Sequence, residues 1–98
     1  MTGIELIAKE RQEQIEKHGR TIERDIEENK NFQLGNAAAV LATQQGVFSA
    51  RKRLGMMPNN WDDGICLEMC SKGYRERLII AGALIAAELD KILALEKR

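Results

Sequence analysis

Residues 79–87 read IIAGALIAA, and this stretch decides the fold of a chain of 98 residues. The segment is apolar on every side of a helix, and such a helix is normally buried all round. A chain of this length has little protein with which to surround it, because small domains bury a smaller share of their surface. We therefore expect this helix at the centre of the domain or in the interface of an oligomer. Gly82 would let another helix approach closely.

The N-terminal segment carries a second helix pattern, over residues 3–18. Thr2 and Glu5 have the spacing of a capping box, in which each side chain satisfies a backbone N–H group of the other residue. Apolar residues then recur at helical spacing, and Gly19 suits the left-handed conformation of a helix end. A last helix, over residues 74–95, contains the apolar segment.

Shorter elements are expected between these two long helices. The sequence favours a charged surface connection over 20–33 with one turn capped by Thr21, a helix over 33–45 that continues past Gly46 towards Arg53, a loop over 55–64, and a helix over 65–71 capped by Asp62 or Asp63. The prediction is one all-α domain, residues 1–98. It is a bundle of three to five helices with two long antiparallel members, which oligomerises through its C-terminal helix.

Composition excludes several classes of function. Fifteen basic residues balance fifteen acidic ones, whereas binding of duplex nucleic acid needs a basic excess or stripe. No apolar run approaches the roughly 20 residues that span a bilayer, and the N-terminus lacks a signal pattern. Cys66 and Cys70 fit a packed thiol pair better than a metal site. We expect a cytoplasmic protein without a membrane or duplex nucleic acid as partner.

Two charged residues interrupt apolar stripes. Arg11 lies in the middle of the stripe of the first helix, and Glu88 follows the apolar segment of the last. Because a buried charge needs a partner, these two residues are expected to pair. The pair is either an internal salt bridge that fixes helix register or a site where Arg11 holds a phosphate or carboxylate while Glu88 orients it.

Other candidates have both a structural and a functional interpretation. His18, at a helix C-terminus, fits stabilisation by the helix dipole better than catalysis. Trp61 could anchor its polar loop or stack on a planar ligand, and neither alternative is favoured. Arg75 and Arg77 are most often solvated charge, but across an oligomer interface they could bind phosphates.

Several stretches of the sequence carry a resemblance that spans nearly the whole chain. They are ERQEQIEKHG at 10–19, Asp25, LGNAAAVLA at 34–42, PNNWDD at 58–63 and RERLIIAGALIAAELDKI at 75–92. The chain thus resembles small helical proteins encoded in phages and prophages. It is also distantly similar to the all-α NTP pyrophosphohydrolases of the MazG type, whose glutamates and aspartates gather magnesium ions on nucleotide phosphates.

The phage resemblance implies a first hypothesis, namely an oligomer that binds a nucleotide or nucleotide-derived signal and withholds it from a host defence effector. Arg11 would hold phosphate and Trp61 would stack on the base. The ligand-binding candidates are Arg11, His18, Asp25, Trp61, Arg75, Arg77 and Glu88. The partners would be a second copy of the chain and a nucleotide-like molecule in the host cytoplasm, without a cofactor.

The MazG-type resemblance implies a second hypothesis, a magnesium-dependent NTP pyrophosphohydrolase. Its metal ligands would be Glu13, Glu16, Glu88 and Asp90, with Glu10 beside them. Glu88 and Asp90 are spaced ExD where the family has ExxD, which turns one side chain by about 100°. We therefore expect binding rather than hydrolysis. A third hypothesis is a helical module that blocks a host protein, which an exposed apolar patch would favour.

Overall fold

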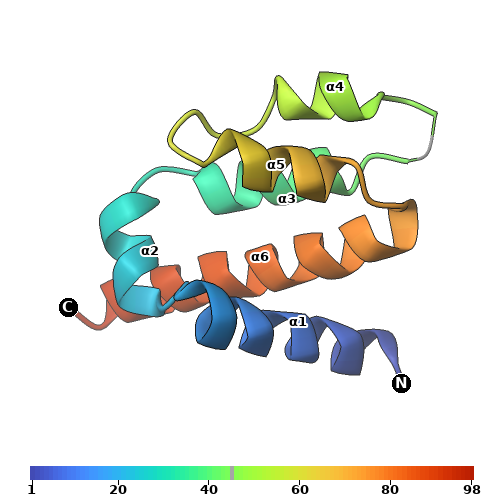
Figure 1. The fold of residues 1–98 in the computed structure, drawn as a ribbon. Coiled ribbons are helices and arrows are strands. Elements are labelled where there is room, and N and C mark those ends of the chain that lie inside the picture. The colour runs from blue at the N-terminus through green and yellow to red at the C-terminus, as the bar shows by residue number, and fades with distance from the viewer. Residues whose placement is uncertain (45) are drawn as a thin grey trace.

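The computed structural model describes residues 1–44 and 46–98, and these residues form helices without a strand (Figure 1). The helices are α1 (Gly3–His18), α2 (Ile22–Glu28), α3 (Gln33–Leu41), α4 (Ala50–Leu54), α5 (Asp63–Cys70) and α6 (Tyr74–Glu96). The all-α prediction is confirmed. The described residues hold six helices rather than three to five, because the charged connection forms α2 and the segment after α3 forms a separate α4.

The ends of the helices follow from the capping residues. Thr2 Oγ1 accepts a hydrogen bond from the backbone N–H of Glu5, and the carboxylate of Glu5 accepts one from Thr2 N. The predicted capping box of α1 is therefore present. Gly19 ends α1 in the left-handed conformation, with φ of 64°. Thr21 caps α2, and Asp62 rather than Asp63 caps α5.

α3 ends at Leu41, before the predicted end at Gln45, which lies outside the described residues. Further on, Gly46 has φ of 88°, a left-handed conformation that a continuous helix does not contain. Arg77 Nη1 donates to the carbonyl oxygens of Leu41 and Thr43, both at 2.7 Å. The carbonyl group of Leu41, the last residue of α3, is thus satisfied by a buried side chain, whereas those of Ala38 and Val40 accept the backbone N–H groups of Ala42 and Thr43.

α6 is the central helix, and α1, α2 and α3 pack against it (Figure 1). The core is formed mainly where α6 meets α3. Its fully buried members include Leu34, Ala37, Leu41, Leu84 and Ala87. Cys66 and Cys70 of α5 are free thiols buried in the same core, which agrees with the predicted packed pair.

α1 approaches α6 closely at Gly82. A Cβ atom on Gly82 would lie 2.5 Å from Ile7 Cδ1, so a larger residue here would displace the Ile7 side chain. α1 and α6 run in the same direction, and the antiparallel prediction was wrong (Figure 1). Helices α2 to α5 lie between them in the chain, so the short connection that makes neighbouring helices antiparallel is absent.

The apolar segment of α6 was expected to be buried on all sides, but it is not. Ala83 and Leu84 are fully buried, whereas Ile85 is 50% exposed. Within the described residues, no helix has the length and apolarity to cross a membrane. The outward side of α6 is therefore an apolar surface, whereas the other sides of this helix are covered by the rest of the domain.

Candidate functional site

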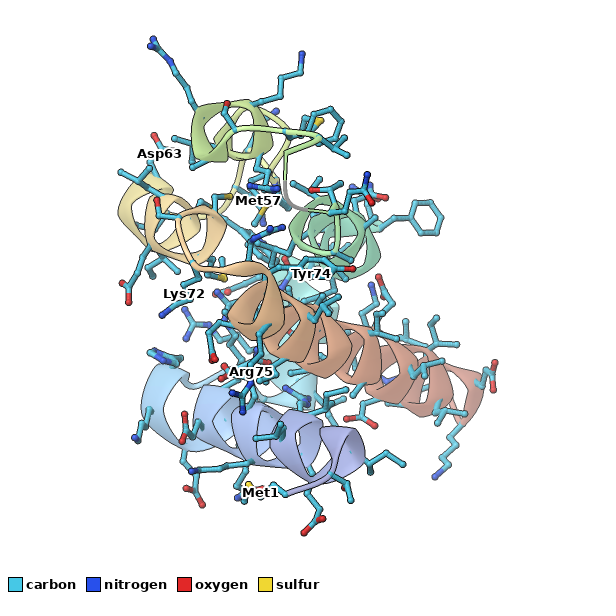
Figure 2. The ribbon with its side chains drawn as sticks, turned by 90° about the vertical axis from the view of Figure 1, so that its right-hand side faces the viewer. Met1, Met57, Asp63, Lys72, Tyr74 and Arg75 are labelled. Carbon is cyan, nitrogen blue, oxygen red and sulfur yellow. The ribbon has the colours of Figure 1, made fainter. Side chains whose placement is uncertain are left out.

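A cleft of about 800 Å³ lies between α1, α2, α5 and the start of α6. Small-molecule sites usually measure roughly 300–1,000 Å³. The residues that line it include Glu10, Glu13, Gln14 and His18 of α1, Arg24, Asp25 and Glu28 of α2, Arg20, Trp61, Glu68, Lys72 and Glu76. Figure 2 shows Lys72 in the turn between α5 and α6, on the side where α5 lies above α1. The cleft is the candidate site.

Trp61 forms part of the cleft wall and is held in place by polar contacts. Its indole Nε1 donates to Asn29 Oδ1 at 2.8 Å, and the guanidinium of Arg20 lies 4.8 Å from the centre of the indole ring. The structure therefore shows Trp61 as an anchor of its loop. A planar ligand would meet the outer side of the Arg20 guanidinium, which is itself a planar stacking surface.

Asp25 and Gln14 are buried polar residues of the same cleft. Asp25 is 1% exposed. Its Oδ1 accepts a hydrogen bond from Asn29 Nδ2 at 3.0 Å, and its Oδ2 has no hydrogen-bond partner among the residues that the structure describes. Gln14 is 4% exposed, and no donor from the described part of the chain reaches its Oε1. Burial raises the pKa of the Asp25 carboxyl, against the opposing effects of the Asn29 hydrogen bond and of the Arg11 and Arg20 charges.

The predicted pairing of Arg11 with Glu88 is wrong. Arg11 Nη2 contacts Asp90 Oδ2 at 3.4 Å, and Nη1 donates to the carbonyl oxygen of Arg20 at 3.0 Å. Residues two positions apart in a helix point in directions that differ by about 200°. Asp90 therefore points towards α1, while Glu88 points towards α3. Arg11 is 8% exposed and braces the turn after α1 instead of lining the cleft.

Glu88 has a different partner, which the sequence analysis missed. Lys91 Nζ lies 2.6 Å from Glu88 Oε1 and donates to the carbonyl oxygens of Asn29 and Asn31 at 2.7 and 2.9 Å. Glu88 Oε2 also accepts a hydrogen bond from the backbone N–H of Gly35 at 3.2 Å. A signal was present in the sequence, because Lys91 comes four residues after Ala87 and seven after Leu84, which places it on the same, buried face of α6.

The remaining predicted residues fall into two groups. His18 lines the cleft near the end of α1, as does Glu13. Arg75 is exposed outside the cleft, and Arg77 is fully buried and bonded to carbonyl groups, so it is neither solvated nor placed to bind a ligand. Glu16 is exposed and accepts a hydrogen bond from Gln12.

The four carboxylates proposed as metal ligands therefore do not meet at one site. They are Glu13, Glu16, Glu88 and Asp90. Among the described residues, no three His, Cys, Asp or Glu side chains lie close enough together to hold a metal ion. The cleft instead brings Glu10 and Glu13 of α1 to the same space as Asp25 and Glu28 of α2. In each helix the two carboxylates are spaced i, i+3, which places them on one face.

Negative charge predominates in the cleft. Its carboxylates are Glu10, Glu13, Asp25, Glu28, Asp62, Glu68 and Glu76, against the cations Arg20, Arg24 and Lys72, with His18 in addition. The pKa of Glu10 is raised by burial and by the neighbouring Glu13 carboxylate, which outweigh a hydrogen bond from Gln14 and the charges of His18 and Lys72. A bare polyphosphate would be repelled here, whereas a ligand accompanied by a cation would be attracted.

Comparison with known proteins adds no constraint on this site. No family model matches the chain, and no curated protein or solved structure is detectably similar to it.

Proposed function

We propose that this protein binds a nucleoside phosphate, accompanied by a divalent cation, in the cleft between α1, α2, α5 and α6. One observation carries the proposal: the cleft joins a planar Arg20–Trp61 stack to carboxylates on two helices and to Lys72. A ring, a polyphosphate and a cation each have a complementary surface in that arrangement.

The base would lie against the Arg20 guanidinium, which lines the cleft, and would extend the stack that begins at Trp61. In the wall of the cleft, Gln14 Oε1 and Asp25 Oδ2 receive no hydrogen bond from residues 1–44 or 46–98. A small rotation of either side chain would pair its oxygen with an N–H group of the ligand. Buried acceptors without a donor are costly, so such a ligand would be favoured over one that offers only acceptors.

The cation would lie between the phosphates and the carboxylates of Glu10 and Glu13. Magnesium usually binds one or two protein carboxylates, with phosphate oxygens and water as its other ligands. A cluster of three protein ligands is therefore unnecessary. Burial is the main cause of the raised pKa of Glu10, and the cation would relieve the Glu13 repulsion that adds to it. Lys72 would meet the far end of the phosphate chain.

The test is titration of the protein with nucleoside mono-, di- and triphosphates and cyclic nucleotides, with magnesium and with a chelator. Trp61 is the only tryptophan, so its fluorescence reports directly on the cleft. We expect binding with magnesium, weakened about tenfold or more in Glu10→Gln, because a charge-assisted contact is lost. Glu16→Gln, on the exposed side of the same helix, is the matched control. Absence of binding across the panel with magnesium would overturn the proposal.

Hydrolysis is the second candidate, favoured by the carboxylate pairs of α1 and α2 in one cleft and by the MazG-type resemblance. A water molecule would attack the α-phosphorus, the bond to the oxygen that bridges to the β-phosphorus would break, and a nucleoside monophosphate and pyrophosphate would form. Pyrophosphate release that requires magnesium and is lost in Glu13→Gln would establish it. Binding without turnover would support sequestration, the role expected of a phage protein that keeps a host signal from its effector.

A further inference from the structure

A continuous apolar stripe runs along the outward side of α6. Leu78, Ile85, Leu89 and Ile92 are between 40% and 54% exposed. They are spaced by seven, four and three residues, so they lie on one face of the helix, and the buried residues lie on the opposite face. The spacing matches the heptad pattern of helices that pack against another helix.

α1 extends this stripe into a face two helices wide. Its side next to α6 is set by Ile7, which packs on Gly82. One flank of α1 carries Glu10 and faces the cleft, so the other flank, which carries Ile4 and Ala8, lies away from it. Ile4 is 82% exposed. Ligand binding and this apolar face therefore use opposite sides of the domain.

We propose that this face binds a second copy of the chain, with the two α6 helices antiparallel and a two-fold axis at Ile85. In that arrangement Ile85 meets the partner's Ile85, and Leu78 meets the partner's Ile92. The inference concerns a different surface from the cleft and stands independently of the ligand.

The size of the face fits a dimer. α6 has 23 residues and α1 has 16, which correspond to lengths of about 34 and 24 Å at 1.5 Å per residue. With each helix about 10 Å wide, the two-helix face covers about 600 Å² in projection. Standard interfaces bury about 800 Å² on each partner and weak, transient ones about 600 Å² or less, so the face has the size of a weak, concentration-dependent dimer interface.

Charge at the two ends of the stripe selects the antiparallel direction. Arg75 and Glu96, both exposed, flank the stripe at opposite ends. A two-fold axis at Ile85 places Arg75 opposite the partner's Leu95, one residue from the partner's Glu96, and the same arrangement forms again at the other end. A parallel pair would place Arg75 beside a second Arg75, which costs free energy. The stripe is thus complementary to itself in only one of the two directions.

The first test is the mass of the protein in solution, by light scattering and sedimentation over a wide range of concentration. We expect a dimer whose dissociation constant rises at least about 100-fold in Ile85→Glu, because two carboxylates would meet at the axis without a partner. Leu67→Glu is the matched control, since Leu67 has similar exposure, 48%, on α5. A wild-type chain that stays monomeric at high micromolar concentration would overturn the proposal.

Disulfide cross-linking fixes the direction. Copies with Leu78→Cys should not cross-link to one another, but should cross-link when mixed with copies that carry Ile92→Cys. Cross-linking of Leu78→Cys with itself would overturn the antiparallel arrangement. As a second measurement, Arg75→Glu should weaken the dimer, and Glu96→Arg in the same chain should restore it; circular dichroism confirms that each variant remains helical.

Discussion

Asn29 connects Trp61 to Asp25. Its side-chain oxygen accepts the indole N–H of Trp61 at 2.8 Å, and its side-chain nitrogen donates to Asp25 Oδ1 at 3.0 Å. The oxygen of one side-chain amide thus bonds to the loop before α5, and its nitrogen bonds to α2. The fold and the cleft wall depend on the same side chain.

Asn29→Ala should therefore lower the free energy of unfolding and loosen the cleft wall together. Asp25 Oδ1 and the indole N–H would both lose their partner in a buried environment, which costs about 1–3 kcal/mol. Urea denaturation measures the loss, and a red shift of the Trp61 emission reports the loosened wall. Asn59→Ala, at an exposed position of the same loop, is the control and should change neither quantity.

Asp25 should make the stability of the protein depend on pH. Its pKa is raised in the folded state, mainly by burial, whereas in the unfolded chain it is about 3.9. The folded state therefore binds more protons between these two pKa values, and the free energy of unfolding falls as the pH rises through that window. Once the pH exceeds the folded pKa, the full penalty for the buried charge remains.

Asp25→Asn should abolish this dependence, because an amide keeps the acceptor for Asn29 and carries no charge. We expect the variant to be at least as stable as the wild type at neutral pH, with an advantage that shrinks as the pH falls through the raised pKa of the folded state towards the ordinary carboxyl value. Chemical denaturation at a series of pH values measures both. An advantage of constant size at every pH would contradict the assignment.

The helices at the two ends of the chain could be predicted because local chemistry decides them. Thr2, Glu5 and Gly19 fix the limits of α1 without help from distant residues. The end of α3 could not be predicted in the same way. The carbonyl group of its last residue, Leu41, is bonded to Arg77, which is 36 residues away in the sequence and gives no local signal.

The candidate site was only partly accessible to sequence reasoning. Asp25, Trp61, His18 and Glu13 were identified, and they share the cleft. Arg11 was assigned the wrong partner because the direction of α1 relative to α6 follows from the path of the whole chain. Residues such as Gln14 and Lys72, whose types are common on helix surfaces, gave no signal until the packing of four helices brought them together.

Lys91 and Glu88 offer a test of how buried charge contributes to this fold. Lys91→Met should lower the free energy of unfolding by about 3–5 kcal/mol, because it leaves the Glu88 carboxylate without its cation. Glu88→Gln in the same chain should recover part of that loss. A double-mutant cycle from denaturation curves gives the coupling energy. If the two single losses simply add, the pair does not act as a unit.

Arg20 distinguishes stacking from charge in the cleft. Arg20→Lys keeps the positive charge but removes the planar guanidinium that lies over Trp61. If the base stacks on that plane, nucleotide affinity should fall about 2–5-fold, in line with about 0.5–1 kcal/mol for an exposed cation–π contact. Arg24→Lys is the control, since Arg24 is engaged with Glu28 at 2.9 Å instead of an aromatic ring. Calorimetry in magnesium measures both variants. Equal affinities for Arg20→Lys and the wild type would show that Arg20 acts through its charge alone, and the ring of the ligand would then have to lie elsewhere in the cleft.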